Sequence, residues 1–419
     1  MTGPADSSRA SDASVTLLVG GAHATSHFFH LVIPSLFPWL MTDFGLSFTR
    51  AGTLATAFFV VSGIGQALAG FVVDRWGSRR VLWAGLSLFA LAGLVLGAAR
   101  GYPMLLGAAV LAGAGNCVFH PADFTLLNSR VSAARLGHAF SVHALSGNLG
   151  WAAAPIFMTG IAAAAGWRVA AFCASAVALV ALSVIVLFRA LMADTAVSHE
   201  DGAAEAPPGG SALAFLGVGA VWMCFLFFFA STMGFGALQN FGPSVLKNVY
   251  GLSLASSASA LTAYLLGGAG GIAVGGFLAA KSQDHERIVA VLLTVAALMA
   301  LALATGAFPG GTVIPFMALV GFCTGSATPS RDLLVRRAAM ARFGKRSFGR
   351  IYGFVYSGLD VGLSAAPVLF GRLMDRSMFR AVLCGVALFQ VLAVVAALGV
   401  GQRGSPLAAP AIPGETRKR

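Results

Sequence analysis

Three histidines lie on one face of the first long apolar segment of the chain. His23, His27 and His30 follow i, i+4, i+7 spacing, which aligns side chains along one face of a helix. A histidine with a pKa near its usual value of about 6.5 can bind an anion or take up a proton. At about 1.5 Å per residue, His27 and His30 lie near the middle of such a helix, and we predict that they bind a ligand. His23 is shallower and is set aside; the alternative is hydrogen bonding to neighbouring carbonyl groups.

Two further polar pairs interrupt apolar segments. His120 and Asp123 are one helical turn apart, so they could form a proton relay or a structural pair near one end of their helix. Arg331 precedes Asp332. Its guanidinium is a planar fork of donors that suits a carboxylate or phosphonate, but it could equally pair with Asp332 or with Asp123.

A single carboxyl group, Asp360, lies at the centre of another apolar segment. Removal from water disfavours the charged form of a carboxyl group, so Asp360 is a candidate for proton coupling. The alternative is a protonated acid that holds a contact between helices. Three side-chain amides are further candidates for contacts with a ligand: Asn148, Gln239 and Asn240.

The composition of the chain excludes an ordinary water-soluble domain. Hydrophobic residues make up 58% and charged residues only 10% of the 419 residues, whereas soluble domains carry about 25% charged residues. The 52 glycines fit helices that pack closely where lipid supplies no hydrophobic drive for association. We therefore expect an all-α, polytopic membrane protein.

Twelve apolar segments are long enough to cross a hydrocarbon layer of about 30 Å. They cover residues 15–40, 51–73, 81–99, 102–129, 138–161, 169–189, 212–240, 252–280, 288–307, 312–335, 351–374 and 381–401. The expected parts are a tail (1–14), a six-helix bundle (15–189), a linker (190–211), a second six-helix bundle (212–401) and a tail (402–419).

The two halves of the sequence are related. Displaced without a gap, Gly45-Leu46-Ser47 falls on Gly251-Leu252-Ser253, and Gly70-Phe71 falls on Gly276-Phe277. The even number of segments in each half indicates parallel repeats about an axis along the membrane normal.

Charge predicts the orientation. The net charge is +12, but the basic residues stand in short loops rather than in a basic groove with aromatic platforms, so we expect no nucleic-acid partner. With both termini in the cytoplasm, most of the 27 lysines and arginines lie on the cytoplasmic side, as the positive-inside rule requires. A lipid bilayer, the cell's inner membrane, is the expected location.

The loop between the second and third segments, Gly70-Phe71-Val72-Val73-Asp74-Arg75-Trp76-Gly77-Ser78-Arg79-Arg80, resembles the G-x-x-x-D-R-x-G-R-R/K loop of the major facilitator superfamily. The resemblance implies two pseudo-symmetric six-helix bundles and a latch, in which Asp74 accepts hydrogen bonds from the start of the eleventh helix near Gly349–Ile351 and closes the cytoplasmic side. The alternative is a solvated loop that only sets topology. The candidate gating residues are Gly70, Asp74, Arg75, Gly77, Arg79 and Arg80.

Phe119-His120-Pro121 and Gly147-Asn148-x-Gly150 are similar to stretches of the fosmidomycin-resistance branch of that superfamily. The resemblance implies a secondary transporter, and we expect a proton-coupled carrier of a small, anionic organic solute. The alternatives are proton-driven efflux of neutral or cationic drugs and, in a different class, a membrane sensor that transports nothing.

We expect no enzyme, because no P-loop, HExxH or GxSxG stands in a fitting context. The five cysteines form no CxxC pair, so we predict no structural zinc site, no other metal and no cofactor. The expected partners are the solute and protons, and we expect a monomer.

Overall fold

The computed structural model describes residues 4–132, 135–192, 214–343 and 348–404, and the regular structure of this part is helical. The helices of the N-terminal half are α1 (Pro4–Ser35), α2 (Phe37–Phe44), α3 (Phe48–Trp76), α4 (Ser78–Gly97), α5 (Tyr102–Asn116), α6 (Phe119–Arg130), α7 (Leu136–Ala165) and α8 (Trp167–Leu187). The C-terminal half has α9 (Gly219–Tyr250), α10 (Leu254–Lys281), α11 (His285–Ala304), α12 (Val313–Phe343), α13 (Phe348–Asp375) and α14 (Phe379–Gly404), with short 3-10 turns at Ala214–Gly217 and Gly310–Thr312.

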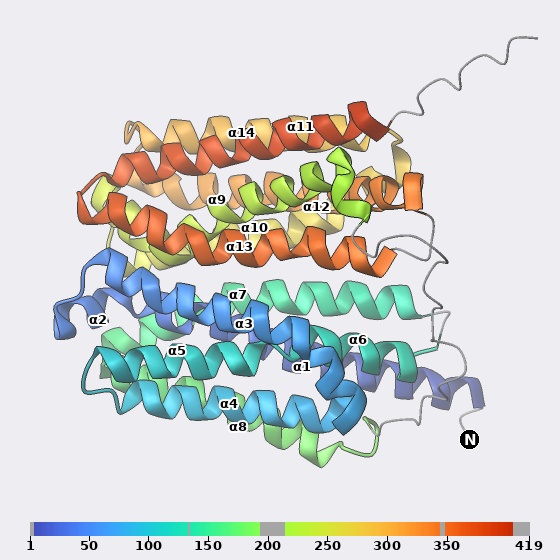
Figure 1. Cartoon of the computed structure of the whole chain (residues 1–419). Coiled ribbons are helices and arrows are strands. Elements are labelled where there is room, and N and C mark those ends of the chain that lie inside the picture. The colour runs from blue at the N-terminus through green and yellow to red at the C-terminus, as the bar shows by residue number, and fades with distance from the viewer. Residues whose placement is uncertain (1–3, 133–134, 193–213, 344–347, 405–419) are drawn as a thin grey trace, which may run out of the picture.

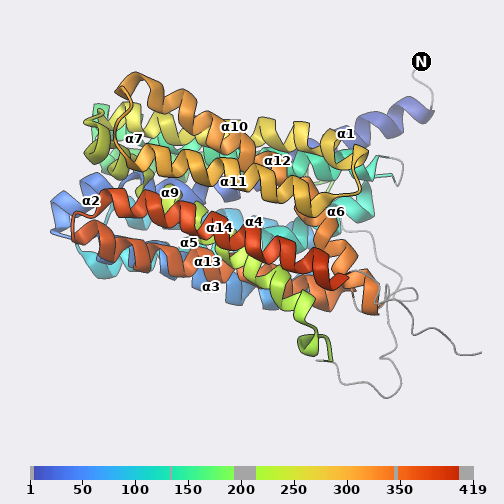
Figure 2. The ribbon, with the colours of Figure 1, turned by 90° about the horizontal axis from the view of Figure 1, so that it is seen from above.

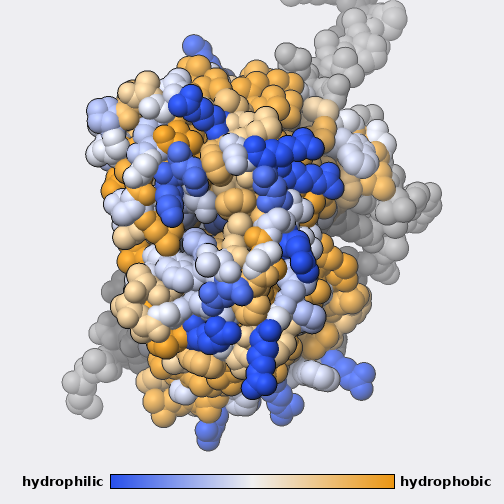
Figure 3. All heavy atoms as spheres, turned by 90° about the vertical axis from the view of Figure 1, so that its left-hand side faces the viewer, coloured by the Kyte–Doolittle hydropathy of each residue, from blue (hydrophilic) through white to orange (hydrophobic). Residues whose placement is uncertain are grey.

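The helices run side by side in two bundles, α1–α8 and α9–α14 (Figures 1 and 2). Helix α1 begins and α14 ends at the same end of the molecule, which we call the terminal end; the opposite end is the distal end (Figure 1). Seen onto the distal end, polar side chains gather across the end face and apolar ones lie at its margins (Figure 3). The all-α fold of two bundles predicted from the sequence is confirmed.

Eleven helical segments of the described residues are long and apolar enough to cross a membrane. The first predicted segment, in α1, is not among them. Helix α1 carries three histidines together with several serine and threonine residues, and these polar groups lower its mean hydropathy.

Two of the predicted segments are broken helices rather than single ones. The first breaks at Leu36, between α1 and α2, and Pro38 stands in the first turn of α2. The fourth breaks at Cys117 and Val118, between α5 and α6. A proline ring collides with the carbonyl group four residues before it, and for Pro121 that carbonyl belongs to Cys117. The segment predicted over 102–129 corresponds to one candidate membrane span, Tyr102–Arg130, interrupted at Cys117 and Val118, and the segment predicted over 15–40 comprises α1 and α2.

The two halves pack closely through α3 and α13. A Cβ atom at Gly52 would lie 2.5 Å from the carbonyl oxygen of Pro367, so only glycine allows this approach of the two backbones. Nearer the middle, a Cβ at Gly63 would lie 3.1 Å from the Cβ of Asp360. Seven residues further on, Gly70 is exposed, and a Cβ atom there would meet no atom of another segment within 4 Å. The contact is therefore confined to the distal half.

The second pair of helices between the halves, α7 and α10, behaves in the same way. The Thr262 hydroxyl donates a hydrogen bond to the carbonyl oxygen of Ala152, at 2.9 Å. Toward the terminal end, Leu145, two turns from Ala152 on α7, is 44% exposed, and Leu266, one turn from Thr262 on α10, is 48% exposed. The halves are thus joined at the distal end and parted toward the terminal end.

Candidate functional site

A buried carboxyl group stands at the centre of the N-terminal bundle. Asp123 on α6 has no exposed surface. Its Oδ2 atom lies 3.1 Å from Nδ1 of His23 on α1 and 3.0 Å from Nε2 of His143 on α7. The two imidazole rings stack with centroids 3.6 Å apart. Helix α1 and the consecutive helices α6 and α7 therefore place two histidines beside one carboxylate oxygen.

A second layer of the site surrounds His30. Nε2 of His30 lies 3.0 Å from Oδ1 of Asn116 on α5, which also accepts a hydrogen bond from the Ser26 hydroxyl. The amide of Asn116 in turn donates to the Ser62 hydroxyl on α3. This network fixes the ring of His30 against α3 and α5, because each of these polar groups is buried and needs a partner.

His120 faces a different partner from the one predicted. Its Nδ1 atom lies 2.9 Å from Oε1 of Gln66 on α3. The direct pair of His120 with Asp123 does not form; Asp123 is held by His23 and His143 instead. Although one turn separates His120 from Asp123 in sequence, the two side chains reach toward different neighbouring helices.

Trp151 on α7 connects this cluster to the other half. Its ring stacks on His27 with centroids 4.2 Å apart, and its N–H donates to Nδ1 of His30, at 3.1 Å. On its other side the same ring contacts Phe235 of α9, at 5.1 Å between centroids. Trp151 therefore lies between the histidines and the C-terminal bundle.

Five histidines thus form one group, of which three were predicted as site residues. The predicted His27, His30 and His120 are close together, and so are His23, which was set aside as too shallow, and His143, which was not considered. The sequence does contain an indication for His143. It is an ionisable residue inside the apolar segment predicted over 138–161, and such residues are costly there and are candidates for function.

The predicted residues of the C-terminal half do not join this group. Asp360 lies on the α13 face that contacts Gly63 of α3, so it is at the contact between the halves. Arg331 pairs with its neighbour Asp332, with 3.0 Å between Nε and Oδ1, rather than with Asp123. Its guanidinium lies 4.8 Å from the ring of Phe228.

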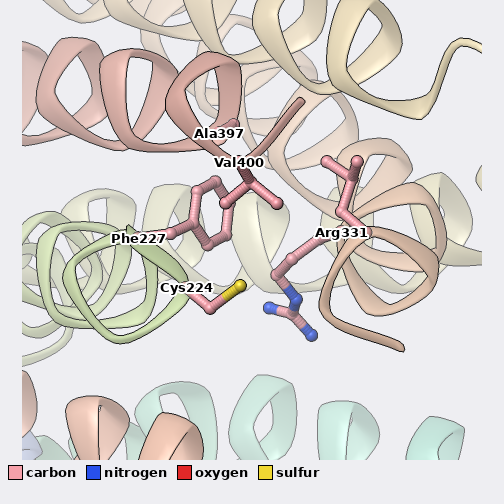
Figure 4. Close-up of a pocket in the computed structure, with 6 residues that line it drawn as sticks. Cys224, Phe227, Arg331, Ala397 and Val400 are labelled. Carbon is pink, nitrogen blue, oxygen red and sulfur yellow. The ribbon is translucent and has the colours of Figure 1, made fainter. Parts of the chain in front are cut away.

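An apolar recess beside Arg331 is shown in Figure 4. Its lining residues are Cys224, Phe227, Arg331, Leu334, Ala397 and Val400. The guanidinium extends away from Ala397 and Val400 (Figure 4), so the recess itself is lined by hydrocarbon and sulfur. It is enclosed by helices of the C-terminal half alone and offers a charged ligand no polar group besides Arg331.

The three predicted amides have different surroundings. Gln239 and Asn240 on α9 are buried. The side-chain nitrogen of Gln239 and the side-chain oxygen of Asn240 have no hydrogen-bond partner among the described residues. Asn148 on α7 is half-buried and donates to the carbonyl oxygen of Ala144 in its own helix. Gln239 and Asn240 therefore carry the unused hydrogen-bonding groups.

The predicted gating loop joins α3 to α4. Gly77 makes the turn with φ +81°, a conformation that favours glycine, and Arg79 donates to the carbonyl oxygen of Arg189. Arg75 and Arg80 are exposed. The side chain of Asp74 and those near Gly349–Ile351 lie outside the described residues, so the latch stays a prediction. Most of the predicted linker 190–211 and of the predicted tail 402–419 also lies outside the described residues.

A helix-capping contact between the halves occurs at the distal end. The two carboxylate oxygens of Asp375, the last residue of α13, accept hydrogen bonds from the backbone N–H groups of Phe48 and Thr49, at the start of α3. The Thr49 hydroxyl donates to the same carboxylate. We call this contact the distal cap; a carboxylate there is favoured by the dipole at the start of the helix.

Two overlapping groups of side chains in the N-terminal bundle have the donor atoms that metal ions prefer. They are His23, His27 and His120, and His23, Asp123 and His143. Within each group the ligating atoms lie within 4.8 Å of one another.

Known proteins resemble this chain over most of its length. A model of the Major Facilitator Superfamily matches residues 19–342. The fosmidomycin resistance protein of Escherichia coli is 27% identical over 381 residues, which cover 86% of this chain and 87% of that protein. The uncharacterized MFS-type transporter YfnC of Bacillus subtilis is 24% identical over 399 residues, 92% of each chain.

The fold is also that of solved structures. A bacterial homolog of the human lysosomal transporter Spinster, in an inward-facing and occupied conformation, superposes with a TM-score of 0.72 at 15% identity, over 93% of this chain and 97% of that one.

Proposed function

This chain belongs to the major facilitator superfamily of membrane transporters, and we propose that it is a proton-coupled carrier of a small organic anion that works by alternating access. The observation that carries the proposal is Asp123, a carboxyl group without exposed surface that contacts two histidines inside a membrane-spanning bundle. Ionisable groups at such depth are costly, so they are expected to take part in the transport of protons or solute.

Alternating access is supported by the packing of the halves. Carriers of this kind rock one bundle against the other around a site between them. Here the halves meet at Gly52 and Pro367 and part beyond Gly63. With both termini in the cytoplasm, as the basic residues predict, this arrangement corresponds to an inward-facing state.

Proton coupling is assigned to three groups, Asp123, His120 and Asp360. Asp123 and His120 belong to the histidine group of the N-terminal half. Asp360 lies where the contact between α3 and α13 ends, so its protonation can favour one arrangement of the halves over the other. A carboxyl group that is neutral packs against Gly63 without the cost of a buried charge.

An anionic solute is supported by the types of polar side chain inside the two bundles. His27 and His30 can bind an anion when protonated, and the Arg331 guanidinium presents a planar set of donors to a carboxylate. Gln239 and Asn240 each have a buried polar atom without a hydrogen-bond partner among the described residues, which a bound solute could satisfy. Asn148 completes the proposed binding residues.

Export of an antibiotic is the second candidate, in which the solute is a neutral or cationic drug. The similarity to a fosmidomycin resistance protein over 86% of this chain supports export of an antibiotic, but fosmidomycin is itself a phosphonate anion, so the similarity does not favour a neutral or cationic solute. The two candidates share the proton coupling and differ in the charge of the solute.

The test is transport into inverted membrane vesicles with a panel of labelled organic acids and drugs. A proton gradient should drive accumulation of at least one organic acid, whereas accumulation of uncharged drugs alone would support the second candidate. Equal flux of every compound with and without the gradient would exclude coupling.

Variants distinguish a role of Asp360 in proton coupling from a purely structural role. Asparagine resembles a carboxyl group that is permanently protonated, so Asp360→Asn should abolish gradient-driven accumulation and keep the exchange of labelled for unlabelled solute. Asp284→Asn, an exposed acid in the loop before α11, is the matched control and should keep both activities. Loss of exchange together with accumulation in Asp360→Asn would indicate a structural role instead.

A further inference from the structure

We propose that His23, His27 and His120 form a binding site for a divalent transition-metal ion of the zinc type, with Asp123 and Gln66 as the outer partners of two of its ligands. This inference goes beyond the transport of an organic anion and does not depend on it. It rests on the arrangement of three imidazole rings, on the groups behind them and on buried polar atoms that have no partner.

The three rings are arranged as ligands of one ion would be. The distances between ring centroids are 4.3 Å for His23 and His27, 5.3 Å for His23 and His120, and 6.3 Å for His27 and His120. Three imidazoles bound to one tetrahedral Zn²⁺, at about 2.0–2.1 Å from nitrogen to metal, have centroids about 5 Å apart. The ring planes are inclined to one another by 49°, 74° and 60°, as converging ligands require, rather than stacked.

One of the three histidines has a hydrogen-bonded outer partner of the kind that metal ligands have, and a second lies beside a carboxylate. A histidine that binds a metal through one nitrogen usually donates the N–H of its other nitrogen to a carboxylate or carbonyl oxygen. Nδ1 of His120 forms such a hydrogen bond with the amide oxygen of Gln66, at 2.9 Å, which leaves Nε2 of His120 to bind the ion. Nδ1 of His23 lies 3.1 Å from the carboxylate of Asp123 but makes no hydrogen bond among the described residues, so there the carboxylate supplies a nearby negative charge.

The nitrogens of His23 and His27 converge on one small space. A Cβ atom at Gly147 would lie 3.0 Å from Nε2 of His23 and 2.6 Å from Nδ1 of His27, so glycine is needed here to make room for both rings. Nδ1 of His27 and Oδ1 of Asp123 are buried and have no hydrogen-bond partner within the described ranges. An ion would satisfy the first of these atoms directly.

Charge and access are both compatible with an ion. A divalent ion bound by neutral imidazoles is partly compensated by the buried carboxylate of Asp123, which lies behind His23. His23 and His27 are buried, but His120 is partly exposed, so an ion can reach the site from the side of His120. Imidazole nitrogen without thiolate suits Zn²⁺, Co²⁺ and Ni²⁺ rather than Mg²⁺ or Ca²⁺. Three ligands leave a fourth position open.

The test is a titration of the purified, tag-free protein in detergent with Co²⁺ at pH 7.5. We expect one Co²⁺ per chain, with the intense visible absorption of a four-coordinate ion, and its displacement by Zn²⁺ but not by Mg²⁺. A titration that yields only the weak absorption of the six-coordinate aqueous ion would overturn the proposal, and this result needs no variant.

Variants identify the ligands. His27→Gln should abolish the four-coordinate absorption, and Asp123→Asn, which alters an outer partner, should weaken Co²⁺ binding by about 10–100-fold. His138→Gln changes an exposed histidine of α7 outside the group and should bind Co²⁺ as the unaltered protein does. If His138→Gln lost binding as His27→Gln does, the assignment would be wrong.

A replacement ligand covers the case in which removal of a histidine prevents folding. His120→Cys keeps a metal-binding side chain at the same position and should add a sulfur-to-cobalt charge-transfer band in the near ultraviolet. A purely structural histidine predicts no such band. Its absence in a protein that still binds one Co²⁺ would exclude His120 as a ligand.

Discussion

Removal of the distal cap should shift the molecule away from the arrangement described here. In Asp375→Ala the backbone N–H groups of Phe48 and Thr49, at the start of α3, lose the acceptor that the other half provides. The acceptor is present only while the two halves are joined at the distal end. The substitution therefore destabilises that state and leaves a state with an open distal end unaffected.

The size of the shift follows from the type of contact. Loss of a side chain that caps a helix start costs about 0.5–2 kcal/mol of stability. Asp375→Ala also removes the hydrogen bond from the Thr49 hydroxyl, so we expect a loss in the upper part of this range, about 1–2 kcal/mol. Since about 1.4 kcal/mol is a factor of ten in an equilibrium constant, the ratio of the distally closed to the distally open state should fall about 5–30-fold. Asp375→Asn keeps one acceptor oxygen, and its effect should be smaller.

The assay is the distribution of distances between two spin labels at the distal end, one on each half. Arg100→Cys and Lys247→Cys provide exposed sites for the labels in a background whose five native cysteines are replaced. Asp43→Ala is the matched control, because Asp43 accepts a hydrogen bond from Trp167 within its own half. Unchanged distances in Asp375→Ala, or an equal shift in Asp43→Ala, would refute the reasoning.

Two more predictions concern packing and pH. Gly52→Ala places a methyl group 2.5 Å from the carbonyl oxygen of Pro367, which should destabilise the distally closed state by about 1–3 kcal/mol. The same spin-label distances should therefore lengthen. Gly160→Ala is the control: a Cβ atom at Gly160 would meet no neighbour within 4 Å, so the distances should stay unchanged. The hydrogen bond from the Ser132 hydroxyl holds the pKa of Asp12 below its usual value, so Asp12 stabilises the fold above about pH 4 and the contribution is lost as the pH falls through the lowered pKa. Asp12→Asn should therefore lower the thermal unfolding temperature at pH 7, and equal differences at pH 7 and pH 3 would contradict this assignment.

Eleven of the twelve predicted segments have a counterpart among the candidate membrane spans, because lipid leaves few alternatives. A chain that must satisfy its backbone hydrogen bonds inside hydrocarbon forms helices long enough to cross it, and the apolar segments fix where they stand. The breaks at Leu36 and Cys117 were missed for a physical reason. Mean hydropathy over twenty residues does not register the collision of one proline ring with one carbonyl group.

The sequence predicts which site residues share a face of one helix, but it does not predict which residues of different helices come into contact. Spacing alone places His27 and His30 on the face of α1 that bears His23. The pairing of Asp123 with His143 depends on how α6 and α7 lie against each other, which no spacing in the sequence contains. His23 lies nearer the end of α1 than His27 and His30, yet it belongs to the group because Asp123 lies beside it on another helix.

The distribution of ionisable groups constrains how proton and solute can influence each other. Asp123 and the histidines lie in one half, whereas Asp360 and Arg331 lie in the other. The halves part toward the terminal end, so a change of charge at Asp123 can affect the C-terminal half by two routes. One is the set of contacts at the distal end. The other is Trp151, which contacts His27 on one side and Phe235 on the other.

Trp151 is the more direct of these two routes, because it touches the histidine group itself. The tryptophan ring donates to Nδ1 of His30, so it requires that this nitrogen carry no proton. Protonation of His30 at Nδ1 would break this hydrogen bond, so the ring would lose the contact that holds it in place beside Phe235. Proton uptake in one half would thereby loosen a contact with the other, which is the coupling that a carrier of two parted bundles needs.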